Sequence, residues 1–230
     1  MNSLPIPVLN ISTGIILLKN KIAAQTYHIR IQSQDFSQIQ SVTGSAIDIY
    51  QSNPHYDLQP IVQQYAFWDY EPVHHIADIA ITICCCDHEE KKWIENLQQG
   101  DTLFFRLLCG SWVPDQTADH YILISDVKAL SQLYEINRAL PVSKKVTAVV
   151  YAEQEDYLFP DLDQSFPVKT FLISPTDPVQ ILEWIMRSFR KDIQNAVIYV
   201  LGDSPAASFI YHDLKDQSLL EIQTVYLNPF

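Results

Sequence analysis

The change of pattern between the two halves of the chain constrains the fold more than any other feature. In the second half, short apolar segments alternate with helical stretches, which is typical of a parallel sheet covered by helices on both faces. One predicted helix begins at Asp177-Pro178, because Asp caps free N–H groups and Pro suits the first helical position. The predicted strands are 120–125, 146–151, 168–173, 196–201 and 222–227, and the predicted helices are 129–140, 177–190 and 206–216.

The first half shows short segments in which apolar and polar residues alternate, separated by turn-forming residues such as Gly44. The predicted strands are 27–31, 46–50, 62–70, 76–85 and 102–108, with one helix at 89–98. Several short strands with turns between them favour an antiparallel barrel or sandwich over about residues 10–113. The sequence therefore predicts two domains, an antiparallel β-barrel over residues 1–115 and an α/β parallel-sheet domain over residues 116–230, with a hinge near Pro114–Asp119.

Composition excludes several classes of function. The 230 residues include 15 Lys and Arg against 27 Asp and Glu, a formal net charge of -12. Nucleic-acid binding needs a basic face, so no nucleic-acid partner is expected. No apolar run approaches the ~20 residues that span a bilayer, and the first residues lack a secretory signal, so no stable membrane association is expected. Three of the four cysteines are adjacent, at 84–86, which suits neither a disulfide framework nor a metal site and favours a cytoplasmic location.

Five segments, in the same order along the chain, resemble the siderophore-interacting proteins, which are NAD(P)H-dependent ferric-siderophore reductases of the ferredoxin-reductase superfamily. The segments are GSAIDIY (44–50), QQYAFW (63–68), KKWIENLQQGD (91–101), HYILISDVKAL (120–130) and YVLGDSPAA (199–207). The resemblance implies a flavin-reductase-like barrel that holds FAD, followed by a nucleotide-binding-like domain that receives NAD(P)H. It also implies reduction of a ferric siderophore and release of iron in the cytoplasm.

The site residues that the resemblance implies are cofactor-binding ones. Tyr65 would pack on the flavin ring, and Asp126, Gly202 and Asp203 would border the nicotinamide cleft. No catalytic residue and no metal ligand is predicted. Asp126 and Asp203 have a second interpretation, because each ends an apolar strand before a helix and short acids cap helices well.

The flavin motif of the family, Arg-x-Tyr-Thr-x-Arg, is kept here only at Tyr65. Gln63 replaces the first Arg, Ala66 the Thr and Trp68 the second Arg, and residues 31–90 contain no Lys or Arg but nine Asp and Glu. The diphosphate of FAD is usually met by a guanidinium or by exposed backbone N–H groups. The alternative function is therefore a non-catalytic family member that has lost FAD binding and serves as a binding or scaffolding module.

Two further expectations concern the residues around this motif. If 62–70 is one strand, Tyr65 and Phe67 share one face and Trp68 and Tyr70 share the other. The basic residues that can contact a phosphate from outside the motif are Arg106, Lys91 and Lys92.

Overall fold

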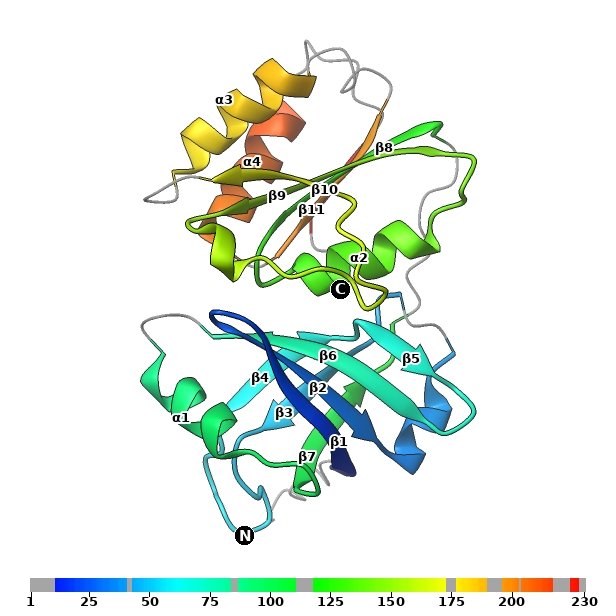
Figure 1. Cartoon of the computed structure of the whole chain (residues 1–230), viewed down its shortest axis with the longest axis vertical. Coiled ribbons are helices and arrows are strands. Elements are labelled where there is room, and N and C mark those ends of the chain that lie inside the picture. The colour runs from blue at the N-terminus through cyan, green and yellow to red at the C-terminus, as the bar shows by residue number, and fades with distance from the viewer. Residues whose placement is uncertain are drawn as a thin grey trace, which may run out of the picture.

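A computed structural model describes residues 11–40, 43–83, 87–110, 118–172, 177–189, 196–202, 204–216 and 224–227. It contains a seven-stranded sheet and a five-stranded sheet, one above the other along the long axis of the molecule (Figure 1). The predicted boundary between residues 115 and 116 lies within 111–117, outside the described residues, and so stays a prediction. No helix in the described ranges is long and apolar enough to cross a membrane.

The first sheet is antiparallel, with the strand order β4-β3-β7-β1-β2-β6-β5. Its strands are β1 (Ser12–Ala23), β2 (Thr26–Gln32), β3 (Ala46–Tyr50), β4 (Val62–Ala66), β5 (Asp69–Glu71), β6 (Ile76–Thr82) and β7 (Thr102–Leu108), accompanied by the 3-10 helix η1 (Gln34–Gln38) and by α1 (His88–Asn96). The two edge strands, β4 and β5, follow each other along the chain, so the sheet curls into a barrel around its apolar core. Isoleucines of β1, β2, β3 and β6 fill this core together with Phe36, Phe67 and Phe105. The predicted antiparallel barrel is confirmed.

Two details of the barrel differ from the sequence prediction. The long strand β1 was not predicted, because its pairing is irregular between Ile16 and Leu18 and its inward positions do not alternate strictly. The predicted strand 62–70 is two strands, since the chain changes partner at Phe67 and Trp68. The N–H of Phe67 donates to the carbonyl of Ser45 beside β3 (3.2 Å), and the N–H of Trp68 donates to that of Asp78 in β6 (2.7 Å).

The second sheet is parallel, with the strand order β10-β9-β8-β11-β12. Its elements are β8 (His120–Asp126), α2 (Leu130–Ala139), β9 (Lys145–Ala152), the 3-10 helix η2 (Glu155–Tyr157), β10 (Val168–Leu172), α3 (Pro178–Phe189), β11 (Val197–Leu201), α4 (Pro205–Asp216) and β12 (Thr224–Leu227). Helix α2 covers the face toward the barrel, and α3 and α4 cover the opposite face (Figure 1). The predicted parallel sheet with two covered faces is confirmed.

The two sheets are joined by a buried contact around Trp68. Its side chain is 2% exposed and packs edge-on against Phe159, 5.4 Å between ring centroids, and stacks on Tyr134 of α2. The indole N–H donates to Asp161 (2.8 Å), and Arg138 pairs with Asp161 and donates to the carbonyl oxygen of Trp68. Apolar packing around Trp68, together with the hydrogen bonds that Trp68 makes to the Arg138–Asp161 ion pair, therefore holds α2 against the barrel.

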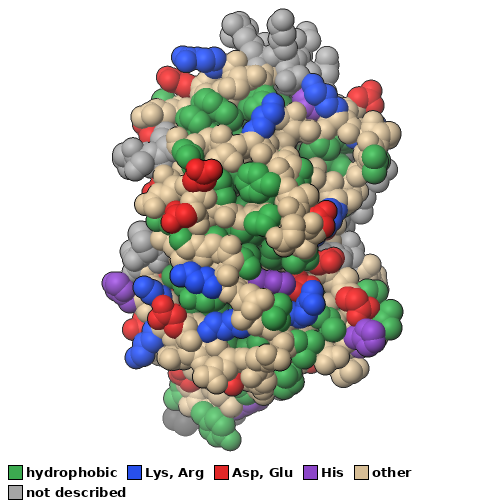
Figure 2. All heavy atoms as spheres, viewed as in Figure 1, with side chains coloured by type: hydrophobic (Ala, Val, Ile, Leu, Met, Phe, Trp, Pro, Cys, Tyr) green, Lys and Arg blue, Asp and Glu red, His purple; other side chains and the backbone are tan. Residues whose placement is uncertain are grey.

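Charged side chains of both signs are spread over the molecule. Figure 2 shows Lys and Arg side chains interspersed with Asp and Glu on the face viewed there, over both sheets.

Candidate functional site

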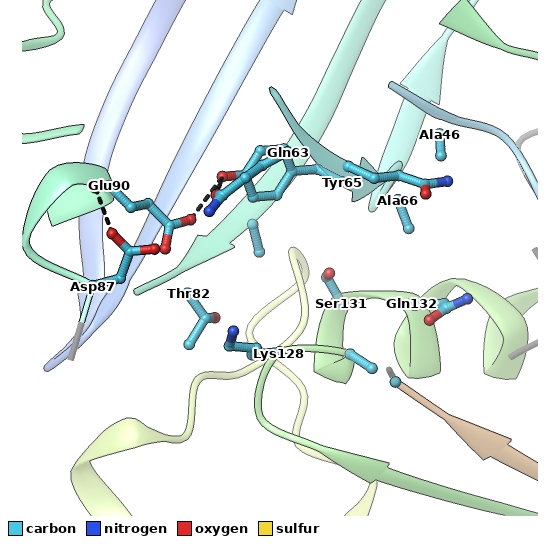
Figure 3. Close-up of a pocket in the computed structure, with 14 residues that line it drawn as sticks. Ala46, Gln63, Tyr65, Ala66, Thr82, Asp87, Glu90, Lys128, Ser131 and Gln132 are labelled. Atoms are coloured by element: carbon cyan, nitrogen blue, oxygen red, sulfur yellow. Dashed lines mark hydrogen bonds between the residues drawn. The ribbon is translucent and has the colours of Figure 1, made fainter. Parts of the chain in front are cut away.

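A cleft of about 300 Å³ lies between the barrel and the start of α2 (Figure 3). The barrel contributes side chains from β3, β4, β6 and the first turn of α1, and the second sheet contributes the β8–α2 segment and the end of β11. The lining residues are Ala46, Gln63, Gln64, Tyr65, Ala66, Ala80, Thr82, Asp87, Glu90, Lys128, Ala129, Ser131, Gln132 and Gly202. Its volume is at the lower end of the range for small-molecule sites.

Tyr65 contributes an aromatic wall to this cleft. It lies on β4 opposite Ile47 of β3, and its hydroxyl is 2.6 Å from Oε1 of Gln63 and 2.7 Å from Oε1 of Glu90 (Figure 3). Because a hydroxyl carries one proton, it donates to one of these oxygens at a time. Burial, followed by the charge of Glu90, raises the pKa of Tyr65 well above its usual value, so the phenol is neutral at pH 7.

The α1 end of the cleft is acidic. Asp87 caps the helix by accepting the N–H of Glu90 (2.9 Å), and Glu89 and Glu90 occupy the first turn, where carboxylates are favourable. Glu90 is 4% exposed, and burial raises the pKa of its carboxyl although the Tyr65 hydroxyl and the charge of Lys128 oppose the shift. The carboxylate of Asp87 therefore takes the position at the N-terminal end of α1 where an external anion would bind.

The site residues predicted in the second sheet are only partly brought together. Gly202 lines the cleft with φ of 106°, and a Cβ built on it would lie 3.0 Å from a carboxylate oxygen of Asp126. Asp126 accepts the N–H of Ala129 (3.0 Å) and so caps the turn into α2, and it does not line the cleft. Asp126 therefore stabilises the turn before α2, and its predicted role beside a nicotinamide stays a prediction. Asp203 lies outside the described residues.

Sequence reasoning missed most of the lining residues of the second sheet. Lys128, Ser131 and Gln132 follow β8 and reach the cleft only because α2 docks on the barrel. The sequence contained one indication of these residues, because Lys128 lies in the segment 120–130, just after the predicted strand that ends near Asp126. Nothing in the sequence pairs Lys128 with Glu90, because that proximity depends on how the sheets meet.

The cleft fits the ring system of a flavin. Three fused rings are flat and carry hydrogen-bonding groups on their edges, and the walls offer the aromatic ring of Tyr65 with the amides of Gln63 and Gln64 and the polar side chains of Ser131 and Gln132. An apolar or aromatic wall with a few polar groups is the usual composition of such sites.

The diphosphate of FAD is not matched in the same way. Arg106 pairs with Asp48, and neither Arg106 nor Lys91 nor Lys92 lines the cleft, so the phosphate contacts predicted from outside the motif are not formed there. Among the described lining residues, Lys128 is the only basic one, against two carboxylates.

Comparison with known proteins gives similarity in structure alone. No family model and no curated protein sequence matches the chain. A siderophore-interacting protein from Aeromonas hydrophila superposes with a TM-score of 0.74 at 15% identity, covering 96% of this chain and 93% of that one. The siderophore-interacting protein of Acinetobacter baumannii gives 0.73 at 16% identity, with 96% and 90% covered. Ferredoxin-NADP+ reductase from Plasmodium falciparum gives 0.65 at 12% identity, with 95% and 96% covered. The chain therefore has the two-sheet fold of the siderophore-interacting proteins and of the wider ferredoxin-reductase superfamily.

Proposed function

We propose that the chain is a flavin-dependent reductase of the siderophore-interacting type, which uses NAD(P)H to reduce a ferric siderophore and releases iron in the cytoplasm. The observation that carries this proposal is the cleft lined by Tyr65 from one sheet and Gly202 from the other. Proteins named for their interaction with siderophores share the fold over nearly the whole chain.

In this proposal the protein holds and orients the ring, and a bound flavin supplies the electron-transfer chemistry. Tyr65 packs on the ring, and the amides of Gln63 and Gln64 with Ser131 on α2 bond to its polar edge. Gly202 leaves room beside Asp126 because it has no side chain. Open parallel sheets bind ligands beyond the carboxyl ends of their strands, at the point where the strand order reverses. In this sheet the order reverses between the neighbouring strands β8 and β11. We place the nicotinamide there, bordered by Asp126, Gly202 and Asp203.

The first test is flavin binding, followed by the visible absorption spectrum and by quenching of flavin fluorescence. We expect the chain to bind a flavin, Tyr65→Ala to weaken binding by about tenfold or more through loss of ring contact, and Tyr65→Phe to stay within about threefold. The control is Tyr56→Ala, because Tyr56 is 88% exposed and outside the cleft. Absence of binding by FAD, FMN and riboflavin at high micromolar concentration would sink the proposal.

The second candidate is a non-catalytic binding or scaffolding module that has lost FAD. The observation that favours it is the acidic α1 end of the cleft, where Asp87 and Glu90 stand against Lys128. If a flavin binds, oxidation of NADH or NADPH coupled to reduction of a ferric chelate separates the two candidates. Turnover supports the reductase, and absence of flavin binding supports the module.

A further inference from the structure

We infer that the cleft accepts the flavin ring and rejects the phosphates attached to it, so that the chain binds riboflavin in preference to FMN and FAD. This inference rests on the proposed function, because it concerns the ligand of the same cleft. It follows from four independent features of the described residues: the charge of the lining, the state of the α1 start, the pairing of the barrel cations and the contact between two glycines.

The charge of the lining is negative at the α1 end. Asp87 and Glu90 line the cleft from one short segment, and Glu89 stands between them in sequence. Lys128 reaches the same region from the opposite sheet but has an exposed side chain, which water and salt screen. A phosphate placed here meets two carboxylates for each cation.

The N-terminal end of α1 is not available to bind a phosphate. Helix starts bind anions through their exposed N–H groups, and the N–H of Glu90 already donates to the Asp87 side chain (2.9 Å). A phosphate would have to displace a carboxylate of the chain and then remain beside it. The site is thus already filled by an internal anion.

Three other cations of the barrel, Arg30, Arg106 and Lys19, are engaged outside the cleft. Arg30 bonds to Asp78 (2.8 Å) and Arg106 pairs with Asp48. Lys19 donates to two carbonyl oxygens at the far end of α1, those of Glu95 (3.0 Å) and Leu97 (2.7 Å). None of these cations lines the cleft.

The glycines that let a backbone approach closely are used for internal packing. A Cβ built on Gly110 would lie 1.7 Å from the carbonyl oxygen of Gly44, so these two backbones are in direct contact. The N–H of Gly110 points to Ser45 Oγ (3.3 Å). Glycines let a backbone come close to a phosphate, but here the backbone of Gly110 lies against that of Gly44 instead.

A neutral ring meets none of these obstacles. Beside the Tyr65 ring the lining carries the amides of Gln63 and Gln64, which donate and accept without carrying charge and suit the uncharged edge of an isoalloxazine, whereas Glu90 contacts the Tyr65 hydroxyl at the α1 end. The preference therefore depends on the phosphate groups alone.

The experiment titrates the whole chain with riboflavin, FMN and FAD at about 50 mM and 500 mM NaCl, followed by flavin fluorescence. We expect riboflavin to bind about tenfold or more tightly than FAD at low salt. FAD affinity should rise with salt, because screening weakens like-charge repulsion, and riboflavin affinity should stay constant.

Charge-removing variants locate the effect. Asp87→Asn with Glu90→Gln keeps the helix cap and the acceptor for Tyr65, and we expect it to raise FAD affinity by about tenfold while leaving riboflavin within about twofold. Glu95→Gln is the control, because it removes one negative charge from an exposed position at the other end of α1.

The outcomes separate the two claims. FAD that binds more tightly than riboflavin, with affinity that falls as salt rises, overturns this inference and leaves the proposed function standing. Absence of binding by all three flavins overturns the proposed function and this inference with it. If the double variant does not fold, the single variants Asp87→Asn and Glu90→Gln decide, and an FAD affinity unchanged in both contradicts the inference.

Discussion

Trp68 joins the two sheets through its ring, its indole N–H and its carbonyl oxygen. The ring lies among Tyr134, Phe159 and His28, and the polar groups bond to Asp161 and Arg138. The flavin motif that QQYAFW resembles has an Arg at this position, whereas here a Trp fills the contact between the sheets.

Substitution of Trp68 separates its two contributions to stability. Trp68→Phe keeps an aromatic ring and removes the indole N–H, and because Asp161 still pairs with Arg138 we expect a loss of about 1 kcal/mol in the free energy of unfolding. Trp68→Ala also empties a buried volume and should cost about 3–5 kcal/mol. Urea denaturation of both variants measures the difference. Equal losses would show that packing of this ring contributes little.

At the scale of elements, β3 and the end of β7 approach each other through Gly44 and Gly110. Gly44 has φ of 86°, and the space where a Cβ of Gly110 would stand is filled by backbone atoms of Gly44. Backbone cannot move aside as a flexible side chain can, so the two strand ends require glycine at position 110.

We therefore expect Gly110→Ala to destabilise the barrel by more than about 3 kcal/mol or to prevent folding. The matched control is Gly100→Ala, which also places alanine in the barrel but meets no atom within 4 Å. Its cost should be about 1 kcal/mol, because only the positive φ of 93° is strained. Thermal and urea unfolding compare the pair. A Gly110→Ala variant as stable as Gly100→Ala would contradict the close contact.

Elements with a regular local pattern were predicted well, and those that depend on distant partners were not. β2 and β3 were predicted from alternation, and α3 was predicted from Asp177-Pro178. The carboxylate of Asp177 does accept the N–H of Val179 (2.9 Å). The prediction that Trp68 and Tyr70 share one face of a strand was wrong, because the strand is interrupted between β4 and β5. Instead Tyr70 donates to the carbonyl of Phe36 in the barrel core (2.8 Å).

At the scale of the whole molecule, Glu135 forms a second polar link between the sheets. It lies on α2, is 6% exposed and accepts the hydroxyl of Thr43 from the barrel. Burial raises the pKa of its carboxyl to about 7, with Asp69 adding to the shift and Thr43 and Arg138 opposing it. The folded chain therefore holds a proton here that the unfolded chain has released.

The sign of the resulting pH dependence follows from proton binding. Between the ordinary value of 4.5 and the folded pKa of about 7, the folded state binds more protons than the unfolded state, so this group lowers stability as pH rises. The full effect is up to about 3 kcal/mol. Glu135→Gln should match the original chain near pH 5 and exceed its stability at pH 8, as measured by urea denaturation. A difference between the two chains that does not vary with pH would contradict this assignment.

The sequence by itself determined most of the elements and their order, the two kinds of sheet and the shortage of cations in residues 31–90, because periodicity, turn residues and charge are local properties. The tertiary structure alone decided the cleft. Its walls come from segments as far apart as Ala46 and Gly202, and the proximity of Glu90 and Lys128 exists only where α2 rests on the barrel. That docking depends on Trp68, whose role no local pattern encodes, because burial and charge pairing are set by neighbours distant in sequence.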